Sequence, residues 1–430
     1  MRFLPFWFFM FAFACSSREL VYERLGATAC GVPDASGTGG AGTGGAVGAG
    51  GAGTGGAVGA GGAGTGGAMG AGGAPTSDSF CGDAVDTTPL VVGVWKDRSP
   101  KLIGFTQTSG STQVMAFGIE ACASVPSTVY LAVSAYPVTR GLCRSEDSGI
   151  HWSRVGPLDA PLDVKVDPAD SNHVYAVQGV NGASSNYGFW EATDARNPAT
   201  WVHRHFNVGP EDAYHIAVDP TDFRHVLVSF HYLWGGYNGS AGIEESFNGG
   251  VTWIEHPPIA GTGYGHAIHF LYSPALGIGN ASTWLLGTQA AGFWRTTNSG
   301  STWTKVTPTG DQFNQAHGGG ELYYAANGSV LTGAYYGAII SSNNGVTWSQ
   351  VTGQNAQQTF AVFGDGTRMF STSAFGGPVK TALETSPASW SNYSSQVIEG
   401  ASFDWTKLGA HTIMGSFWLF KSGVWALQIQ

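Results

Sequence analysis

Three histidines occupy matching places in three similar segments of the sequence. His215 lies in DAYHIAV, His266 in GYGHAIHF and His317 in NQAHGGGEL, with 51 residues between one histidine and the next. Imidazole is a common general base and the commonest side-chain metal ligand. If the segments repeat in space, the three rings converge. Structural hydrogen bonding is our first interpretation, substrate contact or acid/base work the second, and a bound metal the third.

Carboxylates occur near the start of the same kind of segment. Hydrolysis of a glycosidic bond requires two carboxyl groups, one to protonate the leaving oxygen and one to activate water or attack the sugar. Asp212 precedes His215 by three residues, and this is the pair that we expect to work together. The alternative is that each carboxylate only bonds a turn or a channel. The catalytic candidates are Asp212, His215, Asp163, Glu321 and Asp404.

Aromatic side chains follow in stretches near these segments. The stretch HYLWGGYNG runs from His231 to Gly239. Flat aromatic faces stack on sugar rings, and their polar tips bond hydroxyl groups. Packing of the rings inside the fold is the alternative. The expected substrate-binding residues are His266, His317, Tyr232, Trp234, Tyr237, Tyr264 and Tyr335.

An octet with the pattern [ST]-x-[DN]-x-G-x-x-W recurs along the chain. It reads SEDSGIHW from Ser145, SFNGGVTW from Ser246, TTNSGSTW from Thr296 and SSNNGVTW from Ser341, and two eroded copies end at tryptophans 201 and 390. The six tryptophans are 49, 52, 50, 45 and 42 residues apart. A β-rich period of about 40–50 residues is typical of propeller blades with four strands each.

This period predicts one all-β propeller with seven blades over residues 85–430. The expected blades are 113–155, 161–204, 213–255, 265–305, 315–351, 357–393 and 400–430. Because an open propeller leaves a free edge, the stretch PLVVGVW from Pro89 is expected to supply a strand to the last blade. Ligands are expected at the loops that lead into the inner strands, on the face opposite the octets.

The octet itself predicts a self-fastened hairpin turn. Its Asp or Asn accepts hydrogen bonds from backbone N–H groups, its Ser or Thr adds a hydroxyl bond, its Gly takes a positive φ and its Trp is buried between strands. A local turn explains every position, so we assign these residues a structural role: Asp147, Trp152, Asn248, Trp253, Asn298, Trp303, Asn343 and Trp348.

The octets resemble the Asp boxes, or BNR repeats, of sialidases, two-propeller xyloglucanases, sortilin-like receptors and photosystem assembly propellers. The resemblance covers residues 85–430 and implies the fold, since unrelated functions share the motif. Classical sialidase activity is doubtful: there is no Arg-Ile-Pro segment and no clear arginine triad. Two-propeller xyloglucanases place their acid and base across a cleft between two domains, whereas this chain carries one propeller.

The N-terminal region predicts export and a tether. Residues 1–15 combine Arg2, an apolar run and small residues, which is typical of an export signal. Cys15 in an Ala-Cys-Ser context predicts lipidation, and cleavage after the A-x-A at 12–14 with free secretion is the alternative. A short segment, 16–35, and a Gly/Ala/Thr-rich tether, 36–75, follow. The expected location is the outer membrane or cell surface, or the medium.

Cysteine usage agrees with an oxidising compartment. Lipidation of Cys15 leaves four cysteines, an even number. We expect Cys122 to pair with Cys143, and buried thiols are the alternative.

Composition excludes several classes of partner. The 430-residue chain has a net charge of −10 and only 19 Lys and Arg, too few for a basic stripe that binds nucleic acid. Membrane contact is expected only through the lipid anchor, and a monomer without a cofactor is expected. The sequence therefore favours an exported carbohydrate-binding or glycosidase-like propeller. The alternative is a non-enzymatic protein-binding scaffold.

Overall fold

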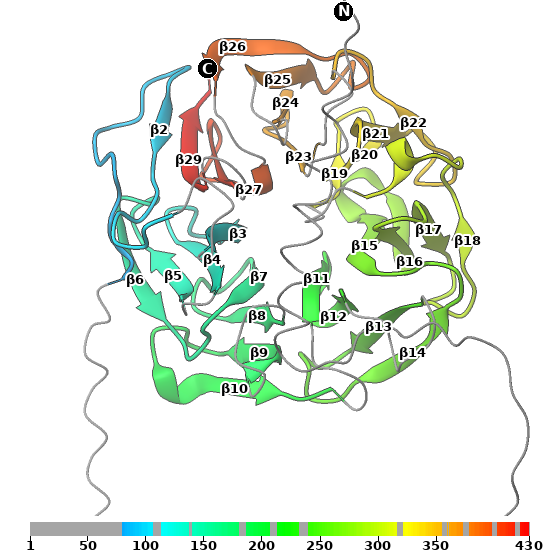
Figure 1. Ribbon diagram of the computed structural model, residues 1–430, viewed down its shortest axis with the longest axis horizontal. Coiled ribbons are helices and arrows are strands. Elements are labelled where there is room, and N and C mark those ends of the chain that lie inside the picture. Colours follow the sequence, from blue (N-terminus) through cyan, green and yellow to red (C-terminus); the bar gives the residue numbers. More distant parts are fainter. Residues whose placement is uncertain are drawn as a thin grey trace, which may run out of the picture. The chain divides into compact units, whose positions relative to one another are not determined.

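The computed structural model describes residues 80–429, apart from 106–112, 137–139, 180–185, 207–212, 232–239, 316–320, 355–358, 360, 373–377, 398–401 and 418–421. All of them belong to the compact unit Ser77–Gln430. Seven antiparallel sheets stand around a common centre like blades (Figure 1). The predicted all-β propeller with seven blades is confirmed. In the described part of the chain, no helix has the length and apolar character needed to cross a membrane.

Blades 1 to 4 follow the chain from the centre outward. Blade 1 contains β3 (Gln113–Ala121), β4 (Val129–Tyr136), β5 (Gly141–Ser145), β6 (His151–Val155) and β1 (Gly82–Asp83). Blade 2 contains β7 (Pro161–Val166), β8 (Val174–Gln178), β9 (Gly188–Ala192) and β10 (Trp201–Arg204). Blade 3 contains β11 (Ala213–Asp219), β12 (Asp222–Phe230), β13 (Ala241–Ser246) and β14 (Ile254–Ile259). Blade 4 contains β15 (Gly265–Ser273), β16 (Ile278–Thr288), β17 (Phe293–Thr296) and β18 (Thr304–Lys305).

Blades 5 to 7 complete the ring. Blade 5 contains β19 (Tyr323–Tyr324), β20 (Val330–Ala334), β21 (Gly337–Ser341) and β22 (Ser349–Gln350). Blade 6 contains β23 (Val362–Gly364), β24 (Arg368–Ser371), β25 (Pro378–Leu383) and β26 (Ser391–Val397). Blade 7 contains β27 (Ser402–Lys407), β28 (Thr412–Phe417), β29 (Gly423–Gln428) and β2 (Trp95–Asp97). In the described part of the chain, three short 3₁₀ helices lie between strands: η2 (Pro198–Thr200), η4 (Pro274–Leu276) and η5 (Asp311–Phe313).

Burial decides which strands lie inside and which lie at the rim. All six residues of the inner strand β7 are buried, whereas the outer strand β6 alternates between exposed and buried positions. A strand that is covered on both faces by neighbouring blades needs side chains suited to burial at every position. Aromatic rings fill the spaces between blades. The ring centroid of Phe189 in blade 2 lies 5.1 Å from that of Trp253, the last residue of the octet in blade 3.

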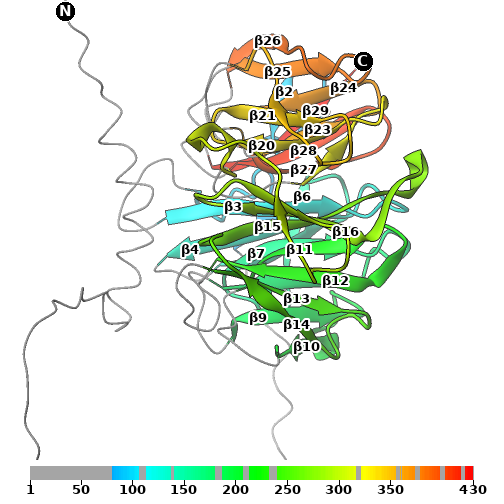
Figure 2. The ribbon, with the colours of Figure 1, turned by 90° about the vertical axis from the view of Figure 1, so that its right-hand side faces the viewer.

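The N-terminal segment closes the ring. Trp95, the last residue of the predicted closing stretch, begins β2 and pairs with Leu427 of β29, so β2 is the outer strand of blade 7 (Figure 1; Figure 2 shows the blades from the side). The prediction that this stretch supplies a strand to the last blade is confirmed. β1 adds a fifth strand to blade 1 by pairing with β6. The same segment therefore covers the edges of the first and the last blade.

The octet turns have the predicted hydrogen bonds. In the first octet, the Ser145 hydroxyl donates to Oδ1 of Asp147 (2.8 Å) and accepts from the N–H of Gly149 (2.9 Å). Asp147 Oδ1 also accepts from the N–H of His151 (2.8 Å), and Trp152 Nε1 donates to the Gly149 carbonyl (2.9 Å). The fourth and fifth octet positions have positive φ in all four copies: Ser148, Gly149, Gly249, Gly250, Ser299, Gly300, Asn344 and Gly345.

The other octets repeat this scheme with Asn in place of Asp. Asn248, Asn298 and Asn343 each accept from the N–H of the threonine four residues later, at 2.9 to 3.0 Å. Trp152, Trp253 and Trp348 are buried, and Trp303 is half-buried. The octet side chains are thus occupied by the turn.

The disulfide differs from the predicted one. Cys81 pairs with Cys143, whereas Cys122 is a free, buried thiol. Cys143 packs in the cluster between blades 7 and 1, together with Cys81 and Met414. Cys122 packs on the opposite face of the same blade, against blade 2, where its Sγ donates to the carbonyl of Asp167 (3.3 Å). The predicted Cys122–Cys143 bond is wrong because the two side chains lie on opposite faces of one sheet.

Candidate functional site

Three polar residues occupy the same place on three inner strands. The strand pairing shifts register between Pro161 and Asp163 in β7, between Ala213 and His215 in β11, and between Ser402 and Asp404 in β27. Such an irregularity redirects the side chain that follows it. Asp163, His215 and Asp404 are all buried near the centre of the ring.

Two of these residues tie neighbouring blades together. Asp163 Oδ2 accepts from the N–H of Ile216 in blade 3 (2.8 Å), and its Oδ1 accepts from Val164 N–H (2.8 Å). Asp404 Oδ2 likewise accepts from the N–H of Ile119 in blade 1 (3.1 Å). Both carboxylates therefore have the structural bonds that were their alternative interpretation.

Lys165 joins the carboxylates at the centre. Its Nζ lies 3.2 Å from Oδ1 of Asp163 and 3.8 Å from Oε2 of Glu120, and it donates a hydrogen bond to Oε1 of Glu321. The Lys165 side chain is only 8% exposed, whereas those of Glu120 and Glu321 are 30% and 38% exposed. Lys165 thus connects a buried carboxylate to two half-buried ones.

Sequence reasoning missed Lys165 and Glu120. Lys165 is a charged residue within LDVKV, which is otherwise a buried-strand pattern apart from Asp163, and Glu120 lies in the apolar run MAFGIEA. A charge inside a strand that is covered on both faces needs a partner. That signal would have added both residues to the candidate list.

The cluster separates the pKa values of its carboxyl groups. Burial raises the pKa of Glu120 to about 8 and that of Asp404 to about 7, and Lys165 opposes both shifts. Burial also raises the pKa of Asp163. Burial opposes the ionisation of Glu321 too, but Lys165 and His215 hold its pKa at about 2. Near neutral pH, Glu120 is therefore protonated and Glu321 is a carboxylate.

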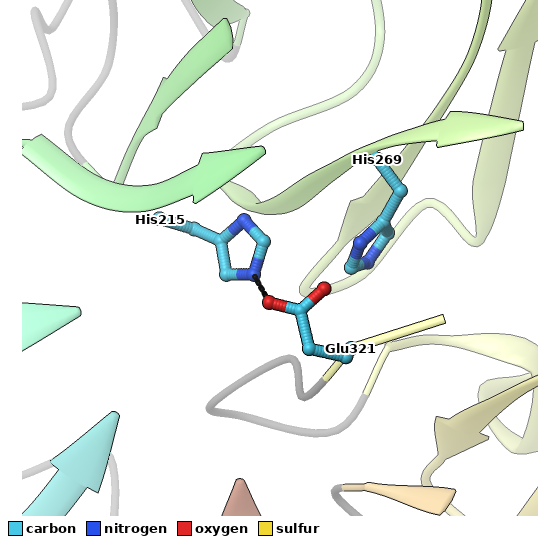
Figure 3. A group of neighbouring side chains, drawn as sticks. All are labelled: His215, His269 and Glu321. Atoms are coloured by element: carbon cyan, nitrogen blue, oxygen red, sulfur yellow. Dashed lines mark ion pairs between the residues drawn. The ribbon is translucent and has the colours of Figure 1, made fainter. Parts of the chain in front are cut away.

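Two histidines lie beside Glu321. His215 Nε2 is 3.7 Å from Oε1 of Glu321, and the His269 ring centroid is 5.0 Å from that of His215 (Figure 3). One ligand atom from each of the three residues lies within 4.8 Å of the other two. Burial lowers the pKa of His215 to about 4 and that of His269 to about 3. Both imidazoles are therefore neutral in ordinary buffers.

His266 does not join His215. Its ring packs against Tyr214 (5.8 Å between ring centroids) and His231 (5.4 Å), and His269 is the residue of β15 that lies beside His215. The register shift of β15 falls between Gly265 and Ile268. The predicted alignment of His266 with His215 is therefore wrong. A shift of one residue in the register of a strand turns the following side chains to its other face.

Several other expected site residues lie outside the described residues: Asp212, His317, Tyr232, Trp234 and Tyr237. The pairing of Asp212 with His215 stays a prediction. Tyr264 is 41% exposed and stacks on His231 with 5.5 Å between centroids. Tyr335 donates its N–H to the carbonyl of Asn314 (3.1 Å).

A cavity of about 590 Å³ opens at the cluster. It is lined by Glu120, Lys165, Glu321 and Asp404, and by Trp405 and Lys407 beside them. A second recess of about 320 Å³ shares Glu120 and Lys165 with it and continues toward the Asp167 and Asp219 turns.

The first cavity includes the β3–β4 and β27–β28 connections, at the same end of the blades as the octet turns. The sequence predicted a site at the opposite end. There, 207–212 and 316–320 fall outside the described residues.

Comparison with known proteins gives a fold and one enzyme relative. No family model matches the chain. A xyloglucanase of Hypocrea jecorina (strain QM6a) is 26% identical over 293 residues, which cover 55% of this chain and 33% of the relative. This chain thus spans about a third of the length of the curated relative that it matches.

Solved structures extend the likeness over most of the chain. YCF48 from Cyanidioschyzon merolae aligns with a TM-score of 0.52 and 12% identity over 78% of this chain and 98% of that one. An ancestral GH74 enzyme aligns with a TM-score of 0.48 and 17% identity over 70% of this chain and 40% of that one. The chain is a seven-bladed β-propeller that resembles YCF48 in fold and a xyloglucanase in sequence.

Proposed function

We propose that this protein is a carbohydrate-acting propeller that hydrolyses glycosidic bonds at the central cavity. The observation that carries the proposal is the pair Glu120 and Glu321, which line one cavity and contact one ammonium group, with pKa values of about 8 and about 2. Two carboxyl groups whose surroundings push their pKa values apart are the arrangement that an acid and a base require.

The two carboxyl groups take different roles. Glu120 keeps its proton near neutral pH and donates it to the leaving glycosidic oxygen. Glu321 is ionised and either activates water or attacks the sugar, depending on the distance between the carboxyl groups. Lys165 is a positioning residue because it bonds Glu321 and holds its charge. Asp163 and Asp404 support the site through the blades that they join.

The sequence likeness suggests where to begin the search for a substrate. The relative that matches this chain is a xyloglucanase, so xyloglucan is the first polysaccharide to test. The match covers 33% of that relative, and in our proposal the one propeller of this chain supplies both carboxyl groups.

The proposal includes export to the cell surface or the medium. The Cys81–Cys143 disulfide supports it, because disulfides persist mainly in oxidising compartments. The predicted lipid anchor at Cys15 would hold the protein at the membrane through the 36–75 tether.

Hydrolysis of xyloglucan and of a panel of other polysaccharides by the purified protein tests the proposal. We expect Glu120→Gln and Glu321→Gln each to reduce kcat by about 10²–10⁴, the usual contribution of a general acid or base. Glu146→Gln is the matched control, since Glu146 is 61% exposed at an octet turn. Equal activity in all three variants would contradict the assigned roles. A folded protein that neither cleaves nor binds any glycan would favour the scaffold alternative.

A further inference from the structure

Side chains from three successive blades meet at one point beside the carboxylate cluster. His215 comes from β11, His269 from β15 and Glu321 from the chain just before β19. Figure 3 shows the two rings and the carboxylate turned toward one another. One nitrogen from each ring and one carboxylate oxygen lie within 4.8 Å of one another.

The histidines have lone pairs to offer. His269 is 2% exposed, and its Nε2 has no hydrogen-bond partner among the described residues. His215 is 4% exposed, and its Nε2 is the nitrogen that faces Glu321, 3.7 Å from Oε1 of that residue. A buried polar atom without a partner is uncommon and requires an explanation, for which a ligand or ion is one answer.

We propose that His215, His269 and Glu321 bind one divalent transition-metal cation of the zinc type. Two neutral imidazoles and one carboxylate form a donor set that such cations prefer, and three protein ligands leave a coordination position open for water. Metal bonds of about 2.0–2.2 Å place tetrahedral ligands about 3.3–3.6 Å apart, so small side-chain rotations bring the three donors together.

The site is different from the predicted one, which combined His215 with His266 and His317. His269 and Glu321 replace those two residues, and the carboxylate supplies a negative charge that three imidazoles lack. That charge is shared with Lys165, which bonds Oε1 of Glu321. The other carboxylate oxygen is directed toward His269 (Figure 3).

Lys165 sets the strength of binding. Its ammonium group repels a second cation nearby and competes for Glu321. We therefore expect wild-type affinity below that of a site without this lysine. Lys165→Met keeps most of the side-chain volume and removes the charge, and it should tighten binding of the cation by about tenfold or more, the ratio that corresponds to one pK unit of interaction.

Titration of the metal-free protein with Co²⁺ alone tests the site, by calorimetry and by the visible absorption of the bound ion. We expect one ion per chain and nitrogen ligation in the spectrum. His269→Gln should weaken binding by more than about 100-fold, beyond the ~10–100-fold loss typical of outer-shell partners. His411→Ala, at an exposed histidine, is the matched control and should bind like the wild type.

Circular dichroism of each variant shows whether it is folded, and Glu321→Gln provides a second, nearly isosteric variant if His269→Gln is not. Absence of Co²⁺ binding by the folded wild type, or equal binding by the folded His269→Gln and Glu321→Gln variants, overturns the proposal. So does unchanged affinity in a folded Lys165→Met variant. Metal binding does not depend on the proposed function: a protein that binds Co²⁺ but cleaves no glycan would refute hydrolysis and leave the metal site standing.

Discussion

Lys165 Nζ lies 3.2 Å from Oδ1 of Asp163, two positions earlier on the same inner strand. The same oxygen accepts from Val164 N–H, while Oδ2 accepts from Ile216 N–H in the next blade. One carboxylate therefore orients the central lysine and fastens two blades. The chemistry at the centre and the junction between blades 2 and 3 therefore involve the same side chain.

This arrangement predicts that Asp163→Asn destabilises the protein although it preserves shape. An amide has one acceptor oxygen, so it can satisfy only one of the two backbone N–H groups, and its NH₂ group then faces a donor. Leaving a buried donor unsatisfied costs about 1–3 kcal/mol. We expect a loss of free energy of unfolding of that size in urea denaturation, with an unchanged m-value.

Asp404→Asn is the matched variant, since Asp404 also accepts from two backbone N–H groups, those of Ile119 and Trp405, whereas Asp163 in addition lies 3.2 Å from Lys165 Nζ. Asp404→Asn should lower the free energy of unfolding by less than Asp163→Asn does. A larger decrease in Asp404→Asn would show that the contact with Lys165 adds nothing to the stability that Asp163 provides.

The disulfide predicts a redox-dependent stability. The Cys81–Cys143 bond closes a loop of 62 residues and fixes the segment that carries β1 and β2. Loss of a native disulfide costs about 2–5 kcal/mol in small secreted domains. Cys143→Ser should lower Tm, and reductant should lower the Tm of the wild type but not that of Cys143→Ser. Cys122→Ser should keep the sensitivity to reductant; loss of that sensitivity in Cys122→Ser would contradict the pairing.

The blade count could be predicted from the sequence because the octet is a local device. The bonds of Ser145, Asp147 and Gly149 all lie within one turn, so their spacing survives as a motif. The closing strand was also predictable, since an apolar stretch precedes the first blade. Neither inference required knowledge of contacts between distant residues.

The centre of the ring could not be predicted in the same way. The register of β15 decides whether His266 or His269 lies beside His215. Sequence spacing does not show where the irregularity in that register falls. The disulfide partners depend on which face of blade 1 each cysteine occupies. Lys165 meets Glu321 across 156 residues, a contact that only the assembled ring creates.

Blades 2 and 3 each contain an Asp–His–Glu relay, and the buried one in blade 3 predicts pH-dependent stability. In blade 3, His225 Nδ1 is 3.0 Å from Asp219 Oδ2 and its Nε2 is 2.8 Å from Glu245 Oε1, which belongs to a carboxylate that His256 also contacts. Burial lowers the pKa of His225, but the bonds to Glu245 and Asp219 outweigh it and raise the pKa.

A raised pKa in the folded state means that the stability is fully present below the unfolded value of about 6.5 and is lost as pH rises through the folded value. In urea titrations between about pH 5 and pH 9, the wild type should lose free energy of unfolding as pH rises, and His225→Gln should lack the share of that loss that His225 causes. His173→Gln, in the equivalent relay of blade 2, should have the same direction of effect. An alkaline loss as steep in His225→Gln as in the wild type would contradict the role of the relay.

Hydrolysis should depend on pH through the proton that Glu120 carries. Glu120 faces Lys165, Glu321, Asp404 and Asp163, and its pKa is about 8. A general acid works only while protonated, so kcat should fall as pH rises through about 8. The residual activity of Glu120→Gln should lack this alkaline fall, because no proton is lost from the amide. Circular dichroism across the same pH range separates titration from unfolding, and an alkaline fall that persists in Glu120→Gln would assign the acid to another group.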